Sequence, residues 1–478
     1  MTQPPNAPPA PPAAPAPPAV PAQRPAGGAG AGVTGAGATP QTGAVRRSAW
    51  SEGVYRIRAA ATTEPGRLRS IGAVLAALLV LFGAVTAWQV ADRKDAAVAV
   101  IDHSQPLSAD AARVYRSLAD ADTSASSGFL AGGDEPRAVR ERYEKDIRDA
   151  SELLAKAAAN SGDSRGAQRQ IAVLNRGLPV YTGLVESARA NNRQGLPLGG
   201  AYLRYANEKM RGELLPAASK LYTVETARLG DDYDDAKSWP FLAIGAGVLA
   251  LAALGWAQRR NYRRTNRVFN QGLLGATAAT LSIVLWLVGG HALARSGLGE
   301  SQDTGARSLQ ALNDAWISAL QARGDENMTL VARGGGATYE ESYKKQMARV
   351  TGNGRQDGLS YADLLADDDK GRDAVKKARD AVGSWKERHA QARAKDDGGD
   401  YDKAVDMVIG PKESTGQSFD EVDDSLSRAT AHEQSQFESA ADDGRGWFAG
   451  LSIGAMVLAV LGAAAALLGI GRRLSEYR

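Results

Sequence analysis

A dense set of hydrogen-bonding side chains follows a long amphipathic run, and its chemistry suits a ligand contact. The residues are Arg189, Asn191, Asn192, Arg193 and Gln194. Guanidinium and amide groups gathered in this way can hold a carboxylate through several hydrogen bonds. Helix termination is the alternative, because an Arg near the last carbonyls, Gly195 in a left-handed conformation and Pro197 as a stop form a common C-terminal pattern. Both interpretations stay open.

Two of the four histidines lie at apolar-stripe positions of predicted helices. His389 and His432 occupy positions that match Val185 and Val224 in the first half of the chain. A single histidine in such a stripe is usually a hydrogen-bonded core residue. The alternative is a pH-sensitive pair inside the second half, because histidine titrates near neutral pH.

Catalytic signatures are missing from the sequence. There is no Cys, which removes thiolate metal sites and cysteine nucleophiles. No phosphate-binding glycine loop, nucleophile elbow or zinc-protease motif is present, and the acidic runs at 231–235 and 367–369 lack the alternation of a calcium-binding loop. We therefore expect a protein without enzymatic activity, cofactor or bound metal.

Four segments with almost no charge are apolar enough to cross a membrane as helices. They are residues 70–90, 240–257, 269–291 and 447–470. A bilayer core needs about 20 apolar residues in a helix, and the first segment starts too far into the chain to be a cleaved signal peptide. At the fourth, Gly446, Gly450 and Gly454 are spaced four apart, which predicts a face for close helix packing in lipid.

Arginines predict the orientation of these spans. Residues 1–69 carry seven Arg against two Glu, and the tail 471–478 carries three Arg against one Glu. The short hinge 258–268 carries Arg259, Arg260, Arg263, Arg264 and Arg267. Because positive short flanks stay on the cytoplasmic side, we expect a plasma-membrane protein with cytoplasmic termini. Arginines fixed between two spans are a topology signal or a contact for lipid or a cytoplasmic partner, and nucleic-acid binding is not expected.

The N-terminal part differs in composition from the rest. Residues 1–45 are dominated by Pro, Ala and Gly and are expected to be disordered. Residues 46–69 mix arginines with Trp50 and Tyr55. This basic segment is either a strip held against anionic lipid or a docking peptide for a cytoplasmic partner.

The two long segments between spans, residues 91–238 and 292–445, have helical periodicity. In the first, apolar residues spaced by three and four mark four amphipathic runs, separated by turn sequences at 131–136, 160–166 and 191–200. The expected fold is all-α, with four transmembrane helices and two tandem extracytoplasmic antiparallel four-helix bundles. Tyr343 matches Tyr143 and Trp385 matches Tyr181 in phase, which predicts an internal duplication.

The block "LPVYTGLVESARANNRQGLPLGGAYL" (178–203), with the paired spans and the Pro/Ala-rich N-terminus, resembles the GlnX-like family of actinobacterial four-span membrane proteins. The long segments resemble the four-helix-bundle sensor modules of bacterial chemoreceptors and sensor kinases, although no kinase, cyclase or methyl-accepting region follows either half. The GlnX-like resemblance implies a role between an amino-acid-binding lipoprotein outside and a soluble Ser/Thr protein kinase inside. It assigns no individual contact residue.

These features together predict a sensor or adaptor that passes an extracytoplasmic signal to a cytoplasmic partner. The ligand would engage the loop at 189–194, and the Arg-rich hinge and the basic segment would present the change inside. A structural envelope scaffold and an accessory subunit of a transporter are the alternatives. A homodimer is compatible with the sequence.

Overall fold

The computed structural model describes residues 64–475 apart from 163, 266–269, 353–356 and 447–449. The predictions for residues 1–45, for most of 46–69 and for Arg267 lie outside the described residues. Within the described ranges the regular structure is helical and no strand occurs. The all-α class is therefore confirmed.

Four helices contain the predicted spans: α2 (Glu64–Ala99), α8 (Phe241–Thr265), α9 (Gln271–Glu300) and α16 (Leu451–Ser475). The described part of the chain has four helical segments long and apolar enough to cross a membrane. Large apolar side chains on them, such as Leu81, Phe241 and Ile453, are exposed, as lipid-facing residues are. These features indicate a multi-pass membrane protein.

The span helices pack against one another: α2 packs against α8 and α16, and α9 packs against the same two helices. Leu79, Leu254 and Leu273 are buried between them. One close approach is between α9 and α16, where a Cβ on Gly272 would lie 2.3 Å from the carbonyl oxygen of Ala465. Glycine is therefore required at this crossing, as in other close helix pairs in lipid.

The helices between the first and second spans form the first interspan region. They are α3 (Gln105–Leu130), α4 (Arg137–Asn160), α5 (Arg165–Arg193), α6 (Leu198–Lys209) and α7 (Leu215–Lys237). The apolar stripes predicted from the sequence bury Leu118, Leu154 and Tyr181. Ser164 caps α5, because its side chain accepts a hydrogen bond from the Ala167 amide.

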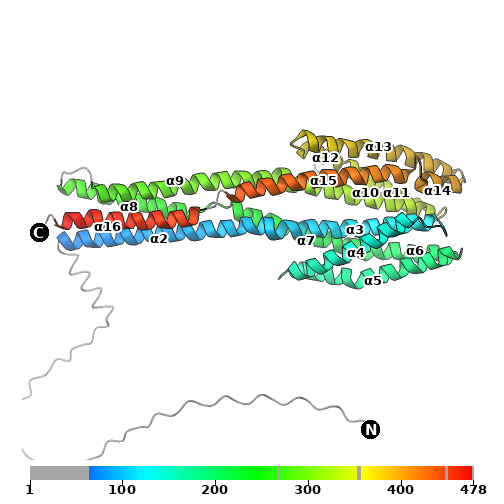
Figure 1. Ribbon diagram of the computed structural model, residues 1–478, viewed down its shortest axis with the longest axis horizontal. Helices are drawn as coiled ribbons and strands as arrows, with labels where there is room; N and C mark the ends of the chain where they lie inside the picture. The colour runs from blue at the N-terminus through cyan, green and yellow to red at the C-terminus, as the bar shows by residue number, and fades with distance from the viewer. Residues whose placement is uncertain (1–63, 163, 266–269, 353–356, 447–449, 476–478) are drawn as a thin grey trace, which may run out of the picture. The chain divides into compact units, whose positions relative to one another are not determined.

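The helices between the third and fourth spans form the second interspan region. They are α10 (Arg307–Val331), α11 (Ala337–Thr351), α12 (Gly358–Leu365), α13 (Asp369–Asp397), α14 (Tyr401–Ile409) and α15 (Thr415–Gly446). Trp385 of α13 is fully buried. Helices α3 and α10 pack against each other, and one hydrophobic cluster contains side chains from both interspan regions (Figure 1).

Spans and interspan helices are joined in two different ways. Helix α2 runs into α3 through the π-helical segment η1 (Val100–Ser104), and α9 runs into α10 through η3 (Ser301–Ala306). The returning connections are broken, at Ser238–Pro240 before α8 and at Gly450, which has a φ of +75° before α16. A third π segment, η2 (Met210–Leu214), joins α6 to α7.

Candidate functional site

Helix α10 buries an unusual run of polar residues in its C-terminal half. Arg323, Asp325, Glu326 and Asn327 are each no more than 4% exposed. Burying such groups costs free energy unless each has a partner. The partners come from α3, η2, α11, α13, α14 and the start of α15, so this polar run connects most of the surrounding helices.

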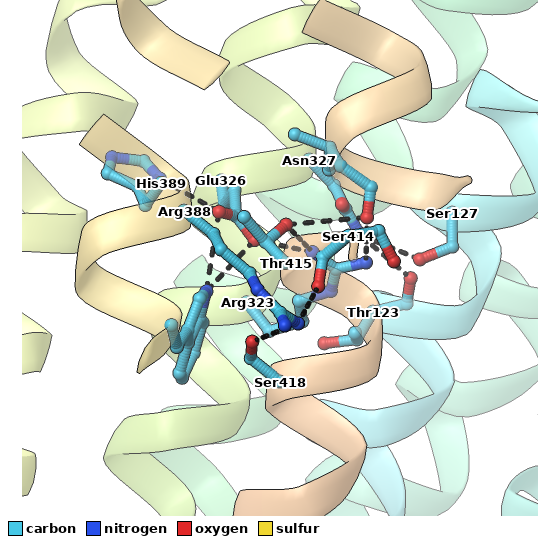
Figure 2. Close-up of polar contacts among 12 residues, drawn as sticks. Thr123, Ser127, Arg323, Glu326, Asn327, Arg388, His389, Ser414, Thr415 and Ser418 are labelled. Atoms are coloured by element: carbon cyan, nitrogen blue, oxygen red, sulfur yellow. Dashed lines mark hydrogen bonds and ion pairs between the residues drawn. The ribbon is translucent and has the colours of Figure 1, made fainter. Parts of the chain in front are cut away.

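Arg323 connects α10 to α14 and to the first residue of α15. Its Nη1 donates to the Glu326 carboxylate and to Thr415 Oγ1, the latter at 2.8 Å, and its Nη2 donates to the Val408 carbonyl at 3.0 Å (Figure 2). On α13, Arg388 donates in the same area to the Ser414 carbonyl and to Ser418 Oγ. Two guanidinium groups therefore fix the entry into α15.

Glu326 is the centre of the network. The Trp385 indole donates to it at 3.2 Å, and His389 Nδ1 lies 2.8 Å from its Oε1. The other ring nitrogen of His389 lies 3.1 Å from Glu340 of α11, and the ring stacks on Tyr343. With a carboxylate at each ring nitrogen, the imidazole is held between two acceptors.

The charges in this network stabilise one another. Burial alone would raise the pKa of Glu326, but Arg323 and His389 hold it below its usual value. Burial would likewise lower the pKa of His389, but its bonds to Glu326 and Glu340 raise it to about 9. At neutral pH His389 is therefore an imidazolium that donates from both nitrogens.

Asn327 carries the network across to the first interspan region. Its Nδ2 donates to Ser127 Oγ at 2.8 Å, to Ser126 Oγ at 3.1 Å and to the Thr123 carbonyl at 3.3 Å (Figure 2). In return, Thr123 Oγ1 donates to the Leu320 carbonyl. A cavity of about 410 Å³ lies beside these contacts, with Thr123, Ser127 and Arg323 among its lining residues.

A second polar cluster lies where α3, α10 and η2 meet. Asp122 accepts from Tyr181 Oη at 3.2 Å and from Asn207 Nδ2 at 2.6 Å. On the α10 side, Arg211 of η2 forms an ion pair with Asp325 at 2.5 Å. Burial raises the pKa of Asp325 to about 6 although Arg211 opposes the shift, and burial also raises the pKa of Asp122.

The predicted loop residues do not act as one group. Arg189 is buried and pairs with Glu135 at 3.0 Å and with Glu186 at 2.6 Å. The side chains of Asn191 and Asn192 bind backbone carbonyls, Asn192 reaching Phe129 at 2.9 Å, and Gly195 has a φ of +66°. Arg193 and Gln194 are exposed. The helix end thus accounts for Gly195, whereas the side chains of Arg189, Asn191 and Asn192 are used in contacts within the chain. The side chains of Arg193 and Gln194 remain available at the surface.

The Arg-rich hinge is largely a continuation of α8, which reaches Thr265. Arg259 and Arg263 are exposed, and Arg260 lies over the Trp256 ring at 5.5 Å. Arg264 falls on the last helical turn, and Arg267 lies outside the described residues. Arg259 and Arg263 therefore lie on the surface of α8 rather than in a loop.

The predicted glycine face on the fourth span needs correction. Gly446 is the last residue of α15, and Gly450 lies outside a helix with a φ of +75°, so the helix is interrupted between them. Only Gly454 packs against another span, where a Cβ would meet the Trp286 ring at 2.3 Å. The three glycines therefore do not share a helix face.

The two histidines are separate. His389 belongs to the buried network, whereas His432 Nε2 lies 2.9 Å from Asp368, the residue that caps α13. Each imidazole therefore has its own acidic partner. No group of three or more His, Asp or Glu side chains within the described ranges is placed to hold a metal ion.

The polar run of α10 and the Asp122 cluster were not predicted from the sequence. A local signal exists, since "ARGDEN" (322–327) interrupts an apolar stripe that resumes at Met328. Its meaning depends on partners from α3, α11, α13 and α15, which are distant in sequence.

Taken together, these features describe a helical multi-pass membrane protein whose interspan helices share a buried polar network. Residues 96–234 match the family model described as "Actinobacterial sensor domain". This range starts near the end of α2 and covers α3 to most of α7, and the match supports a sensor role. No curated protein and no solved structure gives a significant match to the chain.

Proposed function

We propose that the protein is a non-enzymatic transmembrane sensor or adaptor. It relays an extracytoplasmic signal, an amino acid bound directly or through a solute-binding lipoprotein, to a cytoplasmic partner such as a Ser/Thr protein kinase. In this proposal the interspan regions face outward at the plasma membrane and both termini are cytoplasmic. The arginine distribution supports this orientation.

One observation carries the proposal. The sensor-domain match lies on helices that continue out of a span, because α2, η1 and α3 follow one another without a break. A continuous helix moves as a unit, so a shift imposed on α3 is passed along α2 into the membrane. It then reaches the ends of α2 and α8 that carry the arginines.

The second interspan region supports a two-module arrangement by tandem duplication. Helix α10 continues a span through a π segment as α3 does. Tyr143 of α4 and Tyr343 of α11 are both buried, and so are Tyr181 of α5 and Trp385 of α13. The modules differ in charge, because α5 ends with Arg193, followed by Gln194, whereas the corresponding end of α13 carries acidic residues.

The proposal is tested by ligand-dependent capture. The full chain in lipid nanodiscs is mixed with purified solute-binding lipoproteins, with and without each amino acid, and its thermal unfolding is followed. We expect at least one amino acid to change capture or to raise the unfolding temperature. The Arg193→Ala/Gln194→Ala variant should weaken capture, whereas Arg176→Ala, an exposed arginine on α5, should not. A scaffold would show no ligand dependence in any arm.

A further inference from the structure

A cavity lies among the four interspan helices that lead directly to the spans. It has a volume of about 660 Å³ and is lined by residues of α3, α7, α10 and α15. Its wall combines aromatic side chains with side-chain amides. The aromatic residues are Tyr222, Tyr233 and Phe437, and the amide residues are Gln105, Asn313 and Gln434. This size and mixture are typical of sites for small organic molecules.

Arg116 of α3 is the half-buried charged group of this cavity, whereas the other charged lining residues, Arg113, Arg307 and Glu438, are exposed. It lines both this cavity and an adjoining groove of about 600 Å³. Its Nη1 donates to Asn313 Oδ1, and its guanidinium lies 4.2 Å from the centroid of the Trp316 ring. Two neighbours on α10 therefore hold the guanidinium in place from one side.

No carboxylate of the described residues pairs with Arg116 within 4.0 Å. Asp423 acts on it through its electric field but is held by the Trp316 indole at 2.6 Å and by Arg142 at 2.9 Å. Burial and the neighbouring Arg113 lower the pKa of Arg116 to about 10, which leaves it charged at neutral pH. A half-buried cation without an ion-pair partner is unfavourable for stability and favourable for binding an anion.

We propose that this cavity binds a small organic acid, with the carboxylate on Arg116 and the apolar body against the aromatic wall. The inference rests on the proposed sensor function and names the chemical class of its ligand. Because α3 and α10 continue into spans, an occupant between them would change the spacing of the helices that enter the membrane.

The test uses the full chain in nanodiscs of zwitterionic lipid. Probes are straight-chain and aryl monocarboxylates, each compared with its primary amide, and binding is measured by calorimetry and thermal shift. At least one acid should bind about tenfold or more tightly than its amide, since an ionic hydrogen bond is worth on the order of 1.4 kcal/mol or more. Arg116→Met should remove that difference, whereas Arg140→Met, an exposed arginine of α4, should keep it.

A second readout separates binding from folding. Without ligand, Arg116→Met should unfold at the same temperature as the wild type or higher, because the variant loses an uncompensated charge and keeps a side chain against Trp316. A clear loss of stability would make Arg116 a structural residue and overturn the proposal.

Three further results would also overturn it: no acid binds, amides bind as well as acids, or Arg116→Met binds acids unchanged. Copurified phospholipid in the cavity, found by native mass spectrometry and lost in Arg116→Met, would assign the site to lipid instead.

If amino-acid-dependent capture persists in Arg116→Met, the inference fails and the sensor function stands. If capture is absent in the wild type as well, the sensor function fails.

Discussion

His389 shows how a single residue holds helices of the second interspan region together. The imidazolium lies between Glu326 and Glu340, with Arg393 close to the latter at 3.6 Å and Tyr343 stacked on the ring. Three helices, α10, α11 and α13, therefore depend on one proton. A charged group in such a place makes stability depend on pH.

We predict a loss of stability with rising pH that depends on His389. The pKa of His389 is about 9 in the folded chain and about 6.5 when unfolded. Its contribution, at most on the order of 3 kcal/mol, is fully present below pH about 6.5 and is lost as pH rises towards 9. The unfolding temperature of the full chain, measured across this window, should fall more in the wild type than in His389→Gln.

Asp146 also makes the stability of the folded chain fall as pH rises, since burial and Asp120 raise the pKa of its carboxyl to about 9. The measured quantity is therefore the difference between wild type and variant, with His432→Gln as the control. Equal pH dependence in wild type and His389→Gln would contradict the assignment.

The loop after α5 gives a second prediction at this scale. Arg189→Ala removes a buried cation and leaves the half-buried Glu135 without its ion-pair partner, so the free energy of unfolding should fall by about 3 kcal/mol. Arg193→Ala, at an exposed position of the same loop, should change it by less than about 0.5 kcal/mol. Chemical unfolding of both variants checks this, and equal effects would mean that the two arginines share one role.

Residue types alone could not distinguish these arginines. "NNRQG" predicts either a helix end or a polar contact, and only the neighbouring α3 end, which supplies the Phe129 and Gly132 carbonyls for Asn192, shows which side chains are used. Glu326, His389 and Arg323 were harder to predict, because most of their partners lie on helices that are distant in the sequence.

At the scale of elements, the spans were predicted from composition because lipid requires an uninterrupted apolar helix. Helices α2, α8 and α9 contain the first three predicted spans, and α16 starts at Leu451 rather than 447. The π segments were not predicted, since an extra residue in a helical turn leaves no clear trace in hydrophobic periodicity.

The π segment η1 gives a prediction for the helix α2–η1–α3. A π turn contains one residue more than an α turn, so deleting Asp102, an exposed residue of η1, should restore a regular helix and keep both flanking faces in register. Deleting Lys94, an exposed residue of α2, should rotate α3 by about 100° against α2 and expose Leu118. Expression and thermal unfolding compare the two deletions, and equal damage from both would contradict this role of η1.

At the scale of the whole described chain, the two interspan regions are joined through α3 and α10. Gly324 is at this junction, and a Cβ there would lie 3.6 Å from Thr123 Oγ1. Cysteines at both positions should form an intramolecular disulfide, because the sulfur of a cysteine at 123 takes the place of Thr123 Oγ1 and so lies close to the Cβ at 324. The natural chain has no Cys, so gel mobility under oxidation reports this bond alone. A Thr123→Cys/Gly299→Cys pair serves as the control, and equal cross-linking of the two pairs would contradict the packing.

The same cysteine pair tests the central claim, that a ligand moves helices which run into the membrane. The measurement is the rate of disulfide formation between Thr123→Cys and Gly324→Cys in the full chain in nanodiscs, with and without an amino acid or loaded binding protein selected by capture. The account predicts a rate that changes when the ligand is bound and that does not change in the Gly299→Cys control. A rate that stays constant while the ligand is bound would contradict it.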